Sequence, residues 1–235
     1  AGRTFTCVPL PGGRVGQRIP GWGRPIRDDA QDRTAHGAVD LERGLVVSCN
    51  AYFAQLGLAL GGPALQDAAA QFEIPLGQPE SASQIRDTLP FAAYGQGHVL
   101  ASPLKMARVA ATIGNRGRMP DIRWTAGEAE PAEEGREVLA PAHAALLARA
   151  MRRVVTEGTG RSLAGIVPQM AGKTGTAEVA DAPSHAWFVG FAPYGGTGSR
   201  IAYAVIIENG GYGGRTAAPV AAGLVTAARD LGIIK

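Results

Sequence analysis

The chain has 235 residues, of which 46% are hydrophobic and 18% are charged, a composition typical of a folded globular protein with a sizeable core. Its formal net charge is only +3 and its basic residues are scattered, so the sequence does not predict a nucleic-acid-binding surface. It has no run of 18 apolar residues and no apolar stretch of a signal peptide near its start, so we expect no membrane-spanning helix.

The first 35 residues contain many Gly, Pro, Arg and Asp residues and show little periodicity. We expect an irregular lead-in there, with one short strand at residues 3–8. Helical periodicity then dominates residues 36–160, with loops at 73–100 and 125–137. The expected helices cover residues 39–47, 51–60, 65–72, 102–114 and 141–155.

The hydrophobic period changes to that of strands in residues 161–235. Strands are expected at 172–179, 185–194 and 200–209, and a glycine-rich turn predicts that the last two form an antiparallel hairpin. A final helix is expected at 219–231. The sequence therefore predicts one α/β (α+β) domain over residues 1–235, with an antiparallel sheet packed against helices.

Two cysteines, Cys7 and Cys49, are the only thiols of the chain. They can form a disulfide in an exported protein or remain as two buried free thiols, and the sequence leaves both alternatives open. No histidine stands at ligand spacing from them, so we expect no metal site and no cofactor. The histidines are isolated from one another, at His36, His98, His143 and His185.

The segment Ala171–Val179 places a lysine and two threonines at the start of an expected strand. Lys173 can offer a positive charge to a substrate carboxylate, and Thr174 and Thr176 point to the same side of the strand. Gly175 lets a ligand lie close to the backbone, and the N–H of Thr176 can serve as an oxyanion donor. The alternative is a surface lysine with incidental threonines.

Ser48 and Asn50 lie where one expected helix ends and the next begins. Side chains at such a junction can project into a cleft while the helices hold them. Ser48 can relay a proton and Asn50 can hydrogen-bond a substrate amide. The alternative is that one of them only caps the following helix.

Taken together, Ser-x-Asn followed 125 residues later by Lys-Thr-Gly resembles the penicillin-binding proteins and the serine β-lactamases. The flanking strings "YGQGHVLASPLKMARVAATIGNRG", "AGKTGTAEV" and "HAWFVGFAP" narrow the resemblance to the transpeptidase domain of high-molecular-weight penicillin-binding proteins, over most of residues 36–225.

The resemblance implies a cell-wall enzyme that binds the D-Ala-D-Ala end of a peptidoglycan stem peptide and is acylated by β-lactams. It implies proton relay by Ser48, an amide contact by Asn50, and binding of the terminal carboxylate by Lys173, Thr174 and Thr176. A location outside the cytoplasm, a membrane-anchored parent protein and other cell-wall synthesis proteins as partners are also implied.

The nucleophile of this family lies in Ser-x-x-Lys, N-terminal to Ser-x-Asn, but no serine precedes Ser48 in this sequence. Ser102-Pro103-Leu104-Lys105 fits the string but follows Ser-x-Asn, and we interpret Ser102 as a helix N-cap. We therefore expect a partial domain without its nucleophile, inactive alone, whose last strand exposes an edge for self-association. The alternatives are a non-catalytic cell-wall scaffold, a β-lactamase or a D,D-carboxypeptidase.

Overall fold

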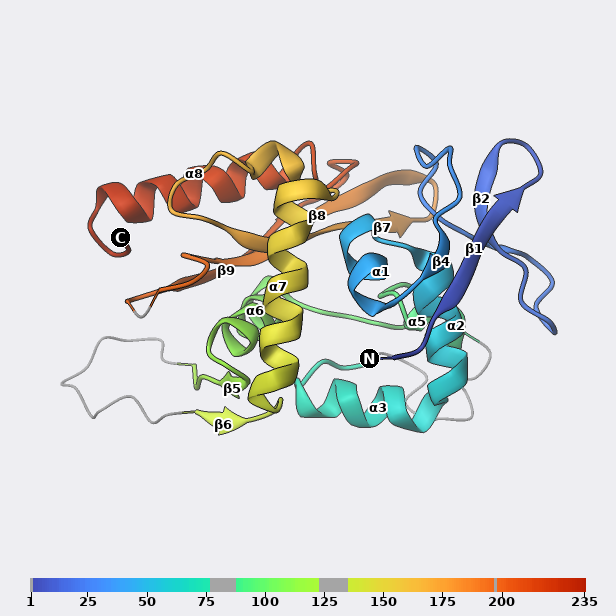
Figure 1. The fold of residues 1–235 in the computed structure, drawn as a ribbon, viewed down its shortest axis with the longest axis horizontal. Helices are drawn as coiled ribbons and strands as arrows, with labels where there is room; N and C mark the ends of the chain where they lie inside the picture. The colour runs from blue at the N-terminus through green and yellow to red at the C-terminus, as the bar shows by residue number, and fades with distance from the viewer. Residues whose placement is uncertain (1, 77–87, 123–134, 197) are drawn as a thin grey trace. The chain divides into compact units, whose positions relative to one another are not determined.

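A computed structural model describes residues 2–76, 88–122, 135–196 and 198–235 of the chain. These residues form two compact units, Ala1–Ala101 and Ser102–Lys235, and each is described by itself (Figure 1). The boundary falls inside the part that we expected to be one helical stretch, residues 36–160. Within the described ranges, no helix combines the length and the apolar character needed to cross a bilayer.

The first unit contains a four-stranded antiparallel sheet with the order β3-β2-β1-β4. The expectation of an irregular lead-in was therefore wrong. The strands are short and are separated by turns rich in Gly and Pro, so the alternation of apolar and polar residues could not be recognised in the sequence. Their bounds are Phe5–Leu10 (β1), Arg14–Gln17 (β2), Ile26–Arg27 (β3) and Gly37–Val39 (β4).

Helices follow the sheet of the first unit. Asp40 caps the first of them, because its side chain accepts the N–H of Arg43. A buried cluster around Tyr52 and Val39 joins the sheet to the helices. The helices are α1 (Leu41–Val47), α2 (Asn50–Leu60), α3 (Gly62–Gln71) and the short α5 (Leu89–Ala92), close to the expected ranges except for α5.

The second unit begins with two helices, α6 (Pro103–Gly114) and α7 (Pro141–Glu157). Both begin with proline in the first turn, as the sequence predicts. Ser102 accepts the N–H of Lys105 at 3.3 Å, so its interpretation as an N-cap is confirmed. Short elements accompany them: β5 (Arg118–Met119), β6 (Arg136–Glu137) and the 3-10 turn η1 (Arg161–Leu163).

The antiparallel sheet of the second unit has the order β7-β8-β9, followed by helix α8 (Ala217–Asp230). Alternate residues of the strands face two different cores. Phe188 and Tyr203 pack with α8 on one face, and Phe191 packs with α6 and α7 on the other (Figure 1). The strands are β7 (Ala171–Val179), β8 (Ala182–Ala192) and β9 (Ile201–Ile207), and this antiparallel arrangement confirms the predicted fold class.

Candidate functional site

Ser48 and Asn50 lie at a sharp junction between α1 and α2. Ser48 ends α1 in the left-handed region, with φ 59° and ψ 46°, and its N–H bonds to the carbonyls of Gly44 and Leu45. A non-glycine residue adopts this conformation at a cost of about 1 kcal/mol, so the surrounding contacts must hold it. Cys49, rather than Ser48 or Asn50, is the N-cap of α2, and its sulfur accepts the N–H of Tyr52.

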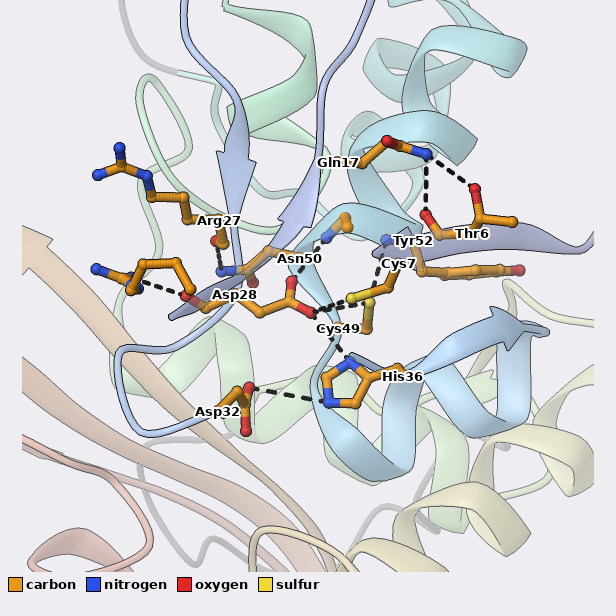
Figure 2. Close-up of polar contacts among 12 residues, drawn as sticks. Thr6, Cys7, Gln17, Arg27, Asp28, Asp32, His36, Cys49, Asn50 and Tyr52 are labelled. Carbon is orange, nitrogen blue, oxygen red and sulfur yellow. Dashed lines mark hydrogen bonds and ion pairs between the residues drawn. The ribbon is translucent and has the colours of Figure 1, made fainter. Parts of the chain in front are cut away.

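Asn50 is fixed by a contact with the sheet of the first unit. Its side-chain Nδ2 donates to the carbonyl oxygen of Arg27 at 3.0 Å (Figure 2). The donor end of the amide is thereby engaged, which leaves the side-chain oxygen as the group that can accept an N–H from a substrate. The expected substrate contact of Asn50 is therefore compatible with its place at the start of α2.

Lys173 lies on β7 in the second unit, and its side chain is half-buried. Its Nζ donates to the carbonyl oxygen of Thr174 at 2.8 Å. Burial lowers the pKa of Lys173 to about 8, because the charged form loses hydration. The ammonium is thus held against the strand and still carries its charge in most molecules at neutral pH.

Thr174 belongs to a pair of hydroxyls that the sequence did not predict. Its Oγ1 lies 2.6 Å from Oγ1 of Thr159, which stands just after α7. Because Thr174 is buried, this hydrogen bond fixes the direction of its hydroxyl. Thr159 lies 15 residues from Thr174 in a Gly-Thr-Gly string, and no local pattern links the two.

Gly175 and Gly213 bring two stretches of backbone close together. A Cβ on Gly213 would lie 2.4 Å from the carbonyl oxygen of Gly175 and 2.2 Å from that of Trp187. A Cβ on Gly175 itself would lie 3.0 Å from Cβ of Trp187, so packing within the protein is part of the reason for a glycine at this point of β7. We had attributed the absence of a side chain at Gly175 to a ligand, and the structure adds this second cause.

The strand that carries these residues is an edge strand among the described elements, because β7 pairs only with β8. Half of its backbone N–H groups therefore point away from the sheet. That arrangement is required by the oxyanion role expected for the N–H of Thr176. Ser48 and Asn50 belong to the first unit and Lys173 and Thr176 to the second, and their approach to one cleft stays a prediction.

A buried cluster of thiol, carboxylate and imidazole groups lies directly behind the Ser48–Asn50 junction (Figure 2). The ligand atoms of Cys7, Asp28, His36 and Cys49 all lie within 4.8 Å of one another. No histidine stands at ligand spacing from the cysteines in the sequence, but the fold brings His36 beside both of them. Both cysteines are free and buried, so the free-thiol alternative is the one that the structure contains.

Strand pairing explains how four residues far apart in sequence meet. Cys7 pairs with Gly37, which directly follows His36. The N–H of Asp28 bonds to the carbonyl of Val15 on the neighbouring strand β2. Strand pairing brings residues 7, 28 and 37 together although they are far apart in the sequence. No motif of fixed spacing therefore marks the cluster, and it could not be predicted from the sequence.

Burial is the largest influence on the pKa values of Cys7, Asp28 and Cys49. Desolvation raises the pKa of Cys7 to about 11 and raises that of Cys49 further above its ordinary range. Burial alone would raise the pKa of Asp28 too, but bonds from His36, the Ala51 N–H and both thiols lower it below its ordinary value. The carboxylate is thus the charged centre of the cluster.

Comparison with known proteins defines the family. Residues 16–226 match the penicillin binding protein transpeptidase domain, which is most of the chain. The chain belongs to this family, as the Ser-x-Asn and Lys-Thr-Gly segments indicate.

The similar proteins are considerably longer than this chain. It is 33% identical over 222 residues to the peptidoglycan D,D-transpeptidase PbpA of Mycolicibacterium smegmatis, which covers 81% of this chain and 44% of PbpA. It is 29% identical to MrdA of Acinetobacter baumannii, over 85% of this chain and 36% of MrdA. The penicillin G acyl-enzyme of penicillin-binding protein A from M. tuberculosis has a TM-score of 0.73 at 27% identity, covering 96% of this chain and 55% of that one. The chain spans about half or less of the length of these proteins.

Proposed function

We propose that this chain provides the substrate-binding and proton-relay part of a serine D,D-transpeptidase that cross-links peptidoglycan. The observation that carries the proposal is the state of Lys173, a half-buried ammonium on an edge strand with its pKa lowered to about 8. A positive charge in this position can attract a substrate anion during function. The family provides a substrate with such an anion, the terminal carboxylate of D-Ala-D-Ala.

Binding of that carboxylate uses three neighbouring residues of β7. Lys173 contributes the charge, and the hydroxyls of Thr174 and Thr176 donate hydrogen bonds to the carboxylate oxygens. The bond between Thr159 and Thr174 orients one of these hydroxyls before substrate arrives. Preorganisation of this kind reduces the entropy lost on binding.

Acyl transfer would then proceed at the penultimate D-Ala. A serine oxygen attacks its carbonyl carbon, the oxyanion is stabilised by the N–H of Thr176, and the terminal D-Ala leaves as an amine. Ser48 passes a proton to that leaving nitrogen, and the side-chain oxygen of Asn50 accepts an N–H of the stem peptide. An amine of a second stem peptide finally takes the acyl group from the serine.

The nucleophilic serine is assigned to a part of the protein outside residues 1–235, because no serine precedes Ser48 in this sequence. From the family we also propose that the protein acts outside the cytoplasm and that the full-length protein is anchored in the membrane. We propose as well that it associates with other cell-wall synthesis proteins. The relatives named peptidoglycan D,D-transpeptidase support the assignment of the full-length protein to this class of enzyme. Strand β9 pairs only with β8 among the described strands, which supports the proposed edge pairing of the isolated chain.

Labelling of the full-length gene product with a fluorescent penicillin tests the proposal. We expect one label per molecule, mapped by peptide mass spectrometry to a serine outside residues 1–235, and abolished by Lys173→Met. The chain of 235 residues alone should not be labelled. Absence of label on the full-length product would instead support a non-catalytic scaffold, and rapid turnover of nitrocefin would support a hydrolase.

A further inference from the structure

We propose that Arg14 and Arg27 form a subsite for a second carboxylate of the acyl-donor stem peptide, one that precedes the D-Ala-D-Ala end. The subsite rests on the proposed function and deepens it, because it determines which stem peptides the enzyme prefers. Both arginines lie in the first unit, on the neighbouring strands β2 and β3. Neither belongs to the Ser-x-Asn or the Lys-Thr-Gly segment.

The two arginines belong to a segment with charge of one sign. Residues 14–27 contain four arginines and no acidic residue, with Arg18 and Arg24 in the exposed loop between β2 and β3. The next carboxylate along the chain, that of Asp28, is 1% exposed and already accepts the Ala51 N–H. Within the part of the chain that the structure describes, no ion pair neutralises any of the four arginines. The strand pair therefore presents an unbalanced positive charge that can attract an anion.

Strand register places Arg14 and Arg27 on one face of the sheet. Gly16 lies directly opposite Arg27 in the antiparallel pair, and Arg14 is two residues before Gly16. Residues two apart on a strand point to the same side, so Arg14 and Arg27 are diagonal neighbours. Val15 and Ile26, the residues beside them, are each 1% exposed and face the core. The two guanidinium groups therefore point outward together and can share one carboxylate.

Arg14 is held in place while part of its hydrogen-bonding capacity stays unused. One of its terminal nitrogens donates to the carbonyl oxygen of Asp28 at 3.1 Å. Its Nε is buried and has no hydrogen-bond partner among the described residues. A buried N–H without an acceptor is costly, and an anion bound beside it would supply the missing acceptor.

Arg27 connects the subsite to Asn50. Its carbonyl oxygen accepts Asn50 Nδ2 at 3.0 Å, while its exposed side chain points away from the buried cluster (Figure 2). Among the described residues, none forms a hydrogen bond or an ion pair with its guanidinium. The carbonyl groups of two consecutive residues, Arg27 and Asp28, therefore anchor the Asn50 amide and the Arg14 guanidinium.

The direction of the bound peptide decides which carboxylate reaches the subsite. In the proposed reaction Lys173 takes the C-terminal carboxylate, and Asn50 accepts an N–H that lies nearer the N-terminus of the stem peptide. The residues before that N–H then run beyond Asn50, and an extended peptide advances by roughly 3.5 Å per residue. A free carboxylate on one of these residues would meet the two guanidinium groups, whereas the corresponding carboxamide would lack the charge.

Matched penicillins test the subsite, because a penicillin imitates D-Ala-D-Ala and its acylamino side chain stands for the residue before it. Benzylpenicillin, carbenicillin and ampicillin differ at one side-chain carbon, which carries a hydrogen, a carboxylate or an ammonium group. Competition with a fluorescent penicillin would give the rate constant of acylation of the full-length gene product by each compound. Arg27→Gln should lower the rate constant for carbenicillin relative to benzylpenicillin about threefold, and should raise that for ampicillin. Arg14→Gln should act in the same direction.

Two further variants separate charge from structure. Arg27→Lys keeps the positive charge and should retain most of the preference for carbenicillin. Arg3→Gln is the matched control, because its guanidinium bonds to the carbonyl of Ala59 near the other end of α2 from Asn50, and it should change neither ratio. Added salt should reduce the preference in wild-type protein and have little effect on it in Arg27→Gln. A ratio between two penicillins does not depend on how much of a variant is folded.

Stem pentapeptides with a free carboxylate or its amide before D-Ala-D-Ala extend the comparison to a peptide donor. Release of D-Ala should be about threefold faster from the carboxylate form with wild-type protein and equal from both forms with Arg27→Gln. Equal ratios in wild type, Arg27→Gln and Arg14→Gln would overturn the proposal, and so would an effect confined to the acceptor peptide. If wild-type protein is acylated regardless of side-chain charge, the subsite fails and the proposed function stands. If no penicillin acylates it, the proposed function fails and the subsite fails with it.

Discussion

The Asp28 carboxylate holds the first turn of α2, because its Oδ1 accepts the Ala51 N–H at 2.9 Å. The negative charge stands at the N-terminus of the helix, where the unpaired N–H groups favour an anion. The side chain is 1% exposed, so water cannot replace this bond. One buried carboxylate thus links the residue after β3 to the helix that begins with Asn50.

Replacement of Asp28 by alanine should destabilise the first unit by roughly 2–3 kcal/mol, because the Ala51 N–H and the two thiols lose their acceptor in a buried site. Urea unfolding followed by fluorescence in a Trp124→Phe, Trp187→Phe background, which leaves Trp22 of that unit as the reporter, would measure the loss. Asp29→Asn is the control and should change stability by less than about 0.5 kcal/mol. Equal stability of Asp28→Ala and the control would contradict this role.

The charge of Lys173 predicts a pH dependence of acylation. With a pKa of about 8, the ammonium prevails below pH 8 and is lost above it, so binding of a carboxylate-bearing β-lactam should weaken as pH rises. At pH 9 the acylation rate at low β-lactam concentration should be about a tenth of its value at pH 7. Lys173→Arg keeps its charge over this range, so any residual activity should not show this fall. A wild-type rate that is constant up to pH 10 would contradict the carboxylate role.

Much of the second unit could be predicted from sequence because its elements are long. The helix from Pro103 to Gly114 has a Ser cap and Pro in its first turn, and its start was predicted to the residue. Strand β8 was expected three residues too late, because Ala182–Ser184 lack the β-branched and aromatic residues that mark a strand.

The strands of the first unit could not be predicted because they are short. Strands of two to six residues are too short for an alternating pattern to stand out among glycines and prolines. The residues of the candidate site also fall into a group that could be predicted and a group that could not. Lys173 and Asn50 could be proposed because short strings carry them, whereas Thr159, Asp28 and His36 reach their partners only through tertiary pairing.

Ser102 gives a test of the rejected nucleophile. Its Oγ accepts the N–H of Lys105, so Ser102→Ala should cost about 1 kcal/mol of stability as the helix loses its cap. Penicillin labelling of the full-length product should be unchanged, since the hydroxyl is used at the helix end. Ser102→Asp keeps a cap and should restore most of the stability. A folded Ser102→Ala protein that cannot be labelled would show that Ser102-Pro103-Leu104-Lys105 is the catalytic string after all.

The close approach of Gly213 to β7 makes it sensitive to a single added methyl group. A Cβ there would lie 2.2 Å from the carbonyl oxygen of Trp187 and 2.4 Å from that of Gly175, and backbone atoms cannot rotate away as a side chain could. Gly213→Ala should therefore displace β7 beside Lys173, lower stability by about 1–3 kcal/mol and slow acylation at least tenfold.

Gly223 is the matched control for that substitution, because it lies in α8 and a methyl group added there would have no neighbouring atom within 4 Å. Gly223→Ala should leave acylation unchanged and add up to about 1 kcal/mol of stability, since alanine loses less backbone entropy in a helix than glycine. Thermal unfolding and the rate of penicillin labelling would be measured for both variants. If Gly213→Ala is acylated as fast as Gly223→Ala, the packing of Gly213 against Gly175 does not shape the substrate-binding strand.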